Sequence, residues 1–179
     1  MRILKKILFV IVGIIALILI IAAFVKKEYA VERQVIINKS NTEVFEYVKY
    51  LKNQDNYSVW GKMDPNIIKS FTGIDGTVGF ISAWESDNKE VGKGEQEIVG
   101  IEEGKRIEFE LRFMEPFEAV EPAYMITEGI DSINTIVKWG FSGKMQYPSN
   151  IMLLWMDMEE IIGSDLENGL DNLKTILEK

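Results

Sequence analysis

The sequence contains neither cysteine nor histidine among its 179 residues. Without cysteine the chain can form no disulfide, no thiol nucleophile, no thiolate zinc site and no lipid attachment through an N-terminal cysteine. Without histidine it can build no imidazole triad, and a zinc or iron site would need carboxylates alone. These absences exclude most hydrolase and metalloenzyme chemistry, and we expect no metal and no cofactor. A binding protein remains, or an enzyme that works with carboxylates, Tyr, Lys or Arg.

Basic residues are also outnumbered. The chain has 20 Lys and Arg against 28 Asp and Glu, which gives a formal net charge of −8. Proteins that bind nucleic acid usually present a basic face to the phosphates, so this balance argues against a nucleic-acid partner. All 28 acidic residues follow Lys27. The simplest explanation of that acidity is solubility, and an acidic domain would need a tether to stay beside an anionic membrane.

One long apolar run stands near the N-terminus. Residues 7–25 are 19 consecutive residues with no charged or polar side chain. A helix of this length measures about 28 Å, close to the roughly 30 Å hydrocarbon core of a bilayer. A buried core helix is one alternative, and a cleavable signal peptide, whose apolar region is usually shorter, is the other. We predict an uncleaved transmembrane anchor over residues 1–27, followed by a single domain over residues 28–179.

The charges beside this run predict its orientation. Three basic side chains precede it and two follow it. By the positive-inside rule the N-terminus lies in the cytoplasm, and the C-terminal domain lies outside the cytoplasmic (inner) membrane. Because no Pro- or Ser-rich linker follows the run, the domain is expected to work close to the bilayer surface.

The first elements of the domain have clear local patterns. Alternating apolar residues predict a strand over residues 29–38. Ser40, followed three residues later by Glu43, forms a capping-box pattern and predicts a helix start. The apolar stripe of that short helix consists of Val44, Phe45, Val48 and Leu51.

A series of short apolar segments separated by turn signals follows. Their even spacing, with no helical interruption, predicts an antiparallel meander. Beyond it, apolar residues at three- and four-residue intervals between Ile151 and Leu177 predict one long amphipathic helix, with Gly163 and Gly169 inside it. Such a helix would close over the apolar face of the sheet in an α+β fold. The predicted meander strands cover residues 67–71, 78–84, 94–101, 106–113, 119–127 and 133–141.

Several motifs carry a family resemblance; they stand at residues 75–79, 84–86, 91–94, 113–117, 137–143 and 163–174. With the order of the elements, they resemble the START-like (SRPBCC) superfamily, and within it the bacterial polyketide cyclase/dehydrase branch. The resemblance spans about residues 30–178. It implies the helix-grip fold, a curved antiparallel sheet of about seven strands wrapped on a long C-terminal helix, here preceded by one transmembrane helix. Families of this fold bind sterols, phospholipids, polyketides or plant hormones, and some members are enzymes.

The resemblance also implies a binding site, a cavity between the concave face of the sheet and the closing helix. Aromatic and methionine side chains suit a variable apolar guest, and one inward Gln could orient a polar end of it. For each residue the alternative is an ordinary place in the core. Strand alternation and the helix stripe nominate Phe80, Trp84, Gln96, Ile98, Phe109, Leu111, Phe113, Tyr124, Ile126, Trp139, Phe141, Trp155, Met158 and Ile162.

Catalytic and metal-binding interpretations are weaker. Glu95 with Glu97, and Glu108 with Glu110, resemble acid/base carboxylate pairs, but alternation places them opposite the apolar residues, in water. Tyr124 could act as an acid on a bound polyketide-like substrate. The glycines lack the spacing of a phosphate-binding loop. The methionines between residues 152 and 158 indicate helix core rather than a copper site.

Three functions are therefore compatible with the sequence. The leading hypothesis is a membrane-anchored protein that binds a hydrophobic small molecule or lipid in the cavity. The first alternative is an enzyme of cyclase or dehydratase type that uses Tyr124 or a buried carboxylate. The second is a ligand-free module that docks a partner protein through its acidic surface.

Overall fold

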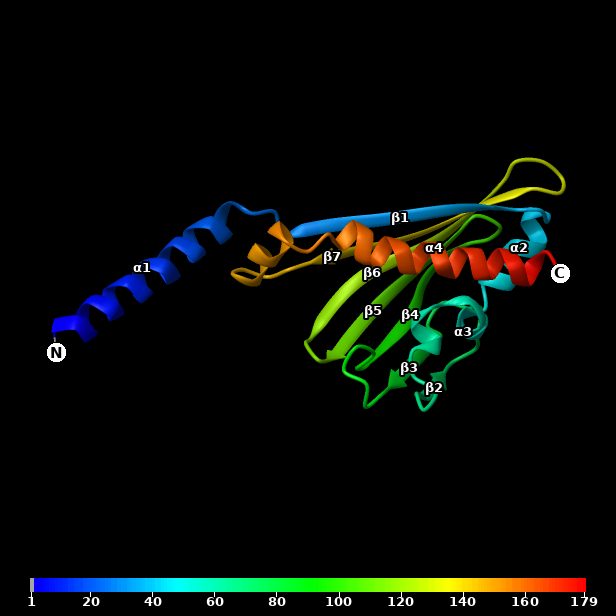
Figure 1. Cartoon of the computed structure of the whole chain (residues 1–179). Coiled ribbons are helices and arrows are strands. Elements are labelled where there is room, and N and C mark those ends of the chain that lie inside the picture. Colours follow the sequence, from blue (N-terminus) through cyan, green and yellow to red (C-terminus); the bar gives the residue numbers. More distant parts are fainter. Residues whose placement is uncertain (1) are drawn as a thin grey trace.

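The computed structural model describes residues 2–179, as one projecting helix followed by a curved sheet that wraps a second long helix (Figure 1). The projecting helix is α1 (Arg2–Phe24), and its buried residue is Ala22. By length and composition α1 can cross a membrane. Because its apolar side chains are exposed, it is not a core helix of this chain. We call the rest of the chain, residues 28–179, the α+β body.

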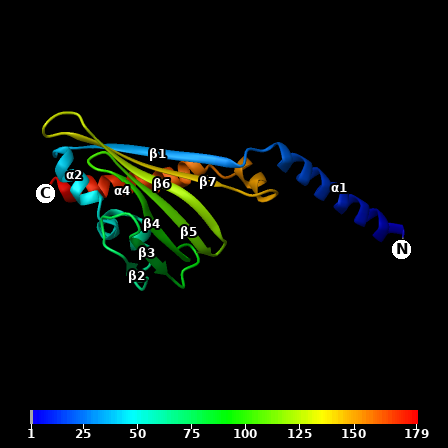
Figure 2. The same ribbon diagram turned by 180° about the vertical axis from the view of Figure 1, so that it is seen from behind.

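Seven strands form one antiparallel sheet in the order β1-β7-β6-β5-β4-β3-β2. The meander and the first strand expected from the sequence are thereby confirmed. After β1 the chain crosses to the other edge of the sheet, where β2 begins the meander, and the meander ends with β7 beside β1 (Figure 2). The strands are β1 (Glu28–Ile37), β2 (Ile68–Thr72), β3 (Ile81–Glu85), β4 (Lys93–Glu102), β5 (Arg106–Glu115), β6 (Ala119–Gly129) and β7 (Thr135–Lys144).

Short helices connect β1 to β2 and cover one end of the concave face. The first begins with the expected capping box, in which the Ser40 hydroxyl accepts from the Glu43 amide and the Glu43 carboxylate accepts from the Ser40 amide. The next helices are held by Asp75, whose carboxylate accepts from the amides of Leu51 and Lys52 at 2.8 and 3.2 Å. They are α2 (Asn41–Val48), η1 (Leu51–Asn53), α3 (Gln54–Tyr57) and η2 (Trp60–Lys62).

The C-terminal segment differs from the single helix expected from residue 151. A 3-10 helix, η3 (Ser149–Leu154), comes first, and α4 (Met158–Leu177) starts after a break. The break falls at Asp157, whose carboxylate accepts from the Glu160 amide at 3.1 Å and caps α4. Inside α4, Gly163 permits close approach to β1, since a Cβ there would lie 2.3 Å from Arg33 Nη2.

α1 joins the sheet at the first residue of β1, and the register defines which end of each strand belongs to that end of the sheet. The register pairs Glu28 with Lys144, and Lys93 with Glu115, so these residues lie at the end where α1 joins β1. We call this the proximal end and the other the distal end. The distal half of the concave face is solidly packed. Its buried side chains include Ile37, Phe45, Val48, Phe80, Ile98, Ile107, Phe109, Met125, Val137, Leu170 and Leu173.

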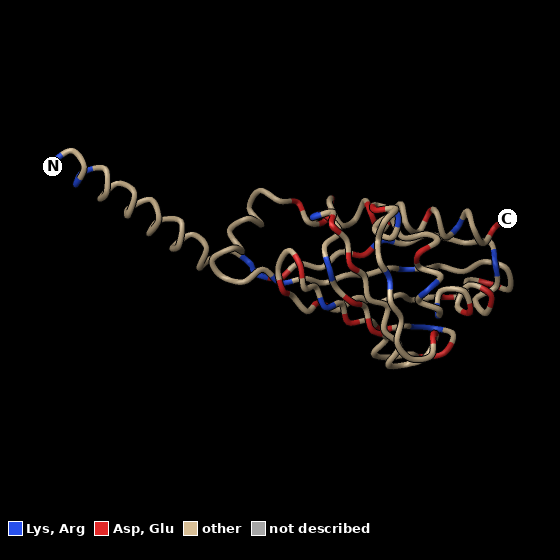
Figure 3. The backbone as a smooth tube through the Cα atoms, turned by 90° about the horizontal axis from the view of Figure 1, so that it is seen from below, with Lys and Arg blue, Asp and Glu red and all other residues tan. Residues whose placement is uncertain are grey.

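The distribution of charge distinguishes α1 from the α+β body. Along α1, Lys and Arg occur only near its N-terminus, whereas acidic and basic residues are distributed over the whole α+β body (Figure 3). The largest ion cluster lies on the convex face of the sheet. There Arg112 contacts Glu95 at 2.6 Å, Glu97 at 2.7 Å and Glu110 at 2.6 Å.

Candidate functional site

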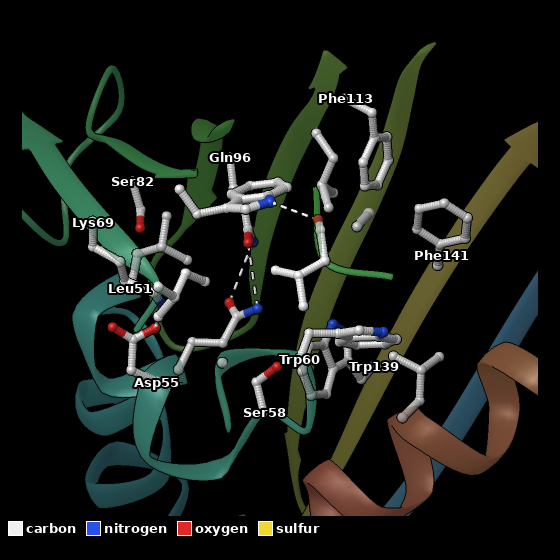
Figure 4. A pocket seen from close by; sticks show the side chains of 18 of the residues that line it. Leu51, Asp55, Ser58, Trp60, Lys69, Ser82, Gln96, Phe113, Trp139 and Phe141 are labelled. Carbon is white, nitrogen blue, oxygen red and sulfur yellow. Dashed lines mark hydrogen bonds and ion pairs between the residues drawn. The ribbon is translucent and has the colours of Figure 1, made fainter. Parts of the chain in front are cut away.

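A cavity of about 260 Å³ occupies the proximal half of the concave face. Its floor is formed by β3 to β7, the first turns of α4 cover one side, and α3 and η2 cover the other (Figure 4). The distal half is filled by side chains, so the concave face holds a packed core and an open space next to each other.

Aromatic rings form one end of this cavity. Trp84 and Phe113 meet edge to face with ring centres 6.1 Å apart, and Trp60 and Trp139 do the same at 6.0 Å. The Trp84 indole donates a hydrogen bond to the Val91 carbonyl at 3.2 Å, which fixes the orientation of its ring. Such edge-to-face pairs are stable arrangements of aromatic rings. This end therefore presents a fixed apolar wall, completed by Phe141, Leu111, Ile162 and Leu166.

Polar side chains form the other end. Gln54 on α3 and Gln96 on β4 exchange hydrogen bonds through their side-chain amides, at 3.3 and 3.2 Å. Because an amide has two donors and two acceptor lone pairs, each retains hydrogen-bonding capacity beyond this pair. An ion pair between Lys69 and Asp55 lies beside them, together with Ser82 (Figure 4). The cavity can therefore hold a molecule with an apolar body and a polar end.

The helices on the polar side are held by the closing helix. The Asn172 side chain on α4 donates to the Tyr57 carbonyl at 3.1 Å, at the end of α3. Tyr57 itself is buried, and burial raises the pKa of its hydroxyl. Its ring meets Trp139 edge to face at 5.7 Å. Contacts between α4, α3 and β7 thus keep the roof of the cavity in place.

The structure brings together seven of the fourteen residues nominated from the sequence. Trp84, Gln96, Phe113, Trp139 and Phe141 line the cavity, and so do Leu111 and Ile162. That they bind a ligand stays a prediction. The others lie elsewhere: Phe80, Ile98 and Phe109 belong to the packed core, Met158 is partly buried in the first turn of α4, and Trp155 is 75% exposed beyond η3.

Tyr124 and Ile126 were expected to face the cavity, and that expectation is wrong. The buried residues of β6 are Glu121, Ala123, Met125 and Thr127, so the opposite parity from Tyr124 and Ile126 faces inward. On the convex face the Tyr124 hydroxyl donates to the Glu32 carboxylate. Burial and this carboxylate raise the pKa of Tyr124 to about 12. The prediction failed because β6 has apolar residues on both faces, so alternation does not decide which face is inward.

The carboxylate pairs lie on the convex face, as expected. Arg112 contacts three of them, and those contacts hold the pKa of its guanidinium above the usual range. Glu108 instead contacts Arg106 at 3.0 Å. None of these four carboxylates lines the cavity. Their geometry is that of ion-paired surface residues.

Sequence reasoning missed the side of the cavity formed by residues 51–69. Gln54, Asp55, Ser58, Trp60 and Lys69 all line it. They stand on helices of three or four residues and on a short edge strand, which are too short to show a periodicity. The one available signal was composition, since a Trp near several polar residues is unusual in an exposed connection.

Comparisons with known proteins identify the fold. No protein-family model and no curated protein matches this sequence. Solved structures do match. The chain superimposes on norcoclaurine synthase from Thalictrum flavum with a TM-score of 0.66 at 8% identity, covering 84% of this chain and 93% of that one. For the Aha1 dimer from Colwellia psychrerythraea the TM-score is 0.56 at 11% identity, covering 84% and 96%.

The fold is the helix-grip fold. A third structure, Ara h 8.0201, matches with a TM-score of 0.55 at 10% identity, covering 84% of this chain and 97% of that one. These structures share the Bet v 1-like (SRPBCC) architecture, with its open antiparallel sheet and long C-terminal helix. The fold expected from the sequence is confirmed. Membership of the polyketide cyclase branch stays a prediction, because identities this low are informative about fold alone.

Proposed function

We propose that this protein is held to a membrane by α1 and binds one small, largely apolar molecule with a polar end in its helix-grip cavity. The observation that carries the proposal is the contrast within the concave face. A sheet that packs its distal half completely leaves about 260 Å³ open in its proximal half. Protein interiors rarely keep such a space without a use for it.

The size of the cavity narrows the ligand class. At about 260 Å³ it lies just below the roughly 300–1,000 Å³ of typical small-molecule pockets. One ring system or one short chain fits this space better than a phospholipid with two acyl chains. Its apolar body would lie between Trp84, Phe113 and Phe141, and its polar end would meet the Gln54–Gln96 pair.

The membrane part of the proposal is supported by α1. Its 23 residues measure about 34 Å, enough for the roughly 30 Å hydrocarbon core. The charge bias around it supports a cytoplasmic N-terminus and an α+β body outside the cytoplasmic membrane. The bound molecule would then be exchanged at or near the bilayer surface.

The structural neighbours support a binding role. A norcoclaurine synthase structure holds dopamine and hydroxybenzaldehyde and superimposes with a TM-score of 0.62 at 8% identity, covering 84% of this chain and 86% of that one. The fold therefore accommodates small aromatic molecules. A cyclase or dehydratase mechanism through Tyr124 gains no support, because Tyr124 points away from the cavity.

Native mass spectrometry of the full-length protein, released from detergent micelles and followed by organic extraction, tests the proposal. Ala123 lines the cavity, so Ala123→Phe fills it, whereas Tyr124→Phe changes the next residue on the opposite face. We expect a bound small molecule in the wild type and in Tyr124→Phe, and its loss in Ala123→Phe. If Ala123→Phe does not fold, Ala123→Leu provides the same test, because its side chain is smaller than that of Phe. A wild type that carries no molecule under several expression conditions would favour the ligand-free interaction module.

A further inference from the structure

The α+β body is fastened directly to the end of α1. Asn150, in η3, is fully buried, and its side-chain amide donates to the carbonyls of Ala22 at 2.7 Å and Val25 at 3.0 Å. Ala22 is one of the last four residues of α1, whose carbonyls have no partner inside the helix. A side chain 128 positions later in the chain therefore caps the C-terminal end of the apolar helix.

The connection between α1 and the sheet is short as well. The Met145 amide donates to the Lys27 carbonyl at 2.8 Å, so the β1–β7 ladder continues to within a few residues of Phe24. Two independent contacts, one through η3 and one through the ladder, thus attach α1 to the proximal end of the sheet. This attachment fixes the orientation of the body relative to the helix.

A third contact lies further along α1. The Tyr147 hydroxyl donates to the Leu19 carbonyl at 3.3 Å. Leu19 is six residues before Val25, the last residue of the uncharged run, which is about 9 Å along a helix. When α1 spans a bilayer, the contact of Tyr147 with Leu19 therefore lies nearer to the bilayer centre than Val25 does, by about 9 Å. Apolar faces of interfacial helices lie at comparable depths, about 5–10 Å into the boundary between headgroups and acyl chains.

The residues around Asn150 present apolar side chains to the outside. Exposed fractions are 46% for Tyr147, 46% for Met152, 55% for Leu154 and 75% for Trp155. Contiguous exposed apolar side chains mark interaction surfaces, and Trp and Tyr are enriched at membrane interfaces because their rings are apolar with a polar tip. We call these four residues the η3 platform. Within it there is no charged residue.

We propose that the η3 platform lies in the bilayer interface beside α1 and holds the proximal end of the sheet against the membrane. The occupant of this surface is the lipid that surrounds α1, because Tyr147 of the platform is hydrogen-bonded to α1 and Asn150, in the same segment, caps the end of that helix. This inference rests on the proposed membrane anchoring. Two residues that line the cavity, Phe141 on β7 and Ile162 on α4, lie on the elements that flank η3 in the chain, so the bound molecule would be exchanged on the membrane side of the body.

Tryptophan quenching by brominated lipid tests the position of the platform. The full-length protein is reconstituted into phosphatidylcholine vesicles with brominated or ordinary acyl chains, as wild type and as Trp155→Phe. Bromine quenches tryptophan only at short range, so we expect a clear loss of quenching in Trp155→Phe. The readout is the difference in quenching between the two proteins. This difference isolates Trp155, because Trp60, Trp84 and Trp139 line the cavity and are present in both proteins.

A matched control places a tryptophan at the opposite end. Ile133 is 65% exposed in the β6–β7 loop at the distal end. Ile133→Trp in the Trp155→Phe background should add fluorescence that brominated lipid does not quench. Alkaline carbonate extraction of the same vesicles reports separately on the insertion of α1.

Three results would overturn the inference. Equal quenching in wild type and Trp155→Phe, with α1 resistant to carbonate, would place the platform outside the lipid and leave the anchor intact. Release of the protein by carbonate would remove the anchor, and the platform with it. A dimer in native mass spectrometry that dissociates in Trp155→Phe would show that a second copy covers the surface.

Discussion

Gln54 and Gln96 lie side by side at the polar end of the cavity and exchange two side-chain hydrogen bonds, at 3.3 and 3.2 Å. The pair joins α3 to β4, and it places paired amides beside Ser82 and the Lys69–Asp55 ion pair at the polar end of the lining. Because Gln96 is nearly buried, a change to one partner leaves the other amide short of a partner.

This pair allows a double-mutant test. We expect Gln96→Leu and Gln54→Leu each to lower the free energy of unfolding by about 1–2 kcal/mol, because each leaves an unpaired amide. The double variant should lose less than the sum, since neither amide remains. Urea denaturation of the four proteins measures the coupling. Strict additivity would mean that the two amides do not interact. The double variant should also bind a more apolar ligand than the wild type does.

Gly140 on β7 lies under the ring of Tyr124 on the convex face. A Cβ at position 140 would lie 2.2 Å from Tyr124 Cζ. We expect Gly140→Ala to lower the free energy of unfolding by about 1–3 kcal/mol, because the ring must move. Tyr124→Ala in the Gly140→Ala background should recover part of the loss. Thermal unfolding measures both, and a Gly140→Ala protein as stable as wild type would show that the ring moves at no cost.

Glu121 should make the protein less stable as the pH rises. It is buried at the proximal end, and burial raises the pKa of its carboxyl, although the Lys144 amide donates to it at 2.9 Å. A carboxyl whose pKa is raised on folding binds a proton more tightly in the folded state. Its contribution to stability is therefore complete below its ordinary pKa of 4.5 and is lost as the pH rises through the folded value.

The variant Glu121→Gln tests this dependence, because its amide oxygen can still accept from Lys144. We expect the free energy of unfolding of Glu121→Gln to equal that of the wild type at acidic pH and to exceed it at neutral pH. Unfolding curves over a pH series measure the difference. Glu118→Gln, an exposed carboxylate in the neighbouring turn, is the control and should leave the pH profile unchanged. If the free energy of unfolding of Glu121→Gln differed from that of the wild type by the same amount at every pH, proton binding by Glu121 would not be the cause of the pH dependence.

Asn150→Asp should loosen the attachment of α1. The amide now donates to two carbonyls, and a carboxylate in its place would face the same two oxygens without a donor. We expect spin labels on α1 and on the β1–β7 end of the sheet to report a broader distance distribution than in the wild type. Asn150→Gln keeps the donors and serves as the control. An unchanged distribution in Asn150→Asp would assign the attachment to the ladder at Lys27 and the Tyr147–Leu19 contact.

The sequence by itself determined the elements and much of their order. The capping box at Ser40, the alternation of Ile107 and Phe109 with charged residues, and the uncharged run over residues 7–25 each depend on neighbours only a few positions apart. Local sterics and burial of one face are enough to specify such elements. For this reason an α+β domain with an antiparallel meander and a long closing helix could be predicted before any contact was known, and the resemblance to the START-like superfamily then implied the helix-grip fold.

The tertiary structure alone decided which residues share the cavity. The inward face of β6 was ambiguous because Tyr124 and Ala123 are both compatible with a core position, and pairing with β5 and β7 selected Ala123. Trp155 matched the helix period, yet it lies between η3 and α4, outside both helices, and is 75% exposed. Whether a concave sheet is filled or open depends on the summed volumes of side chains from many elements. No short segment carries that information.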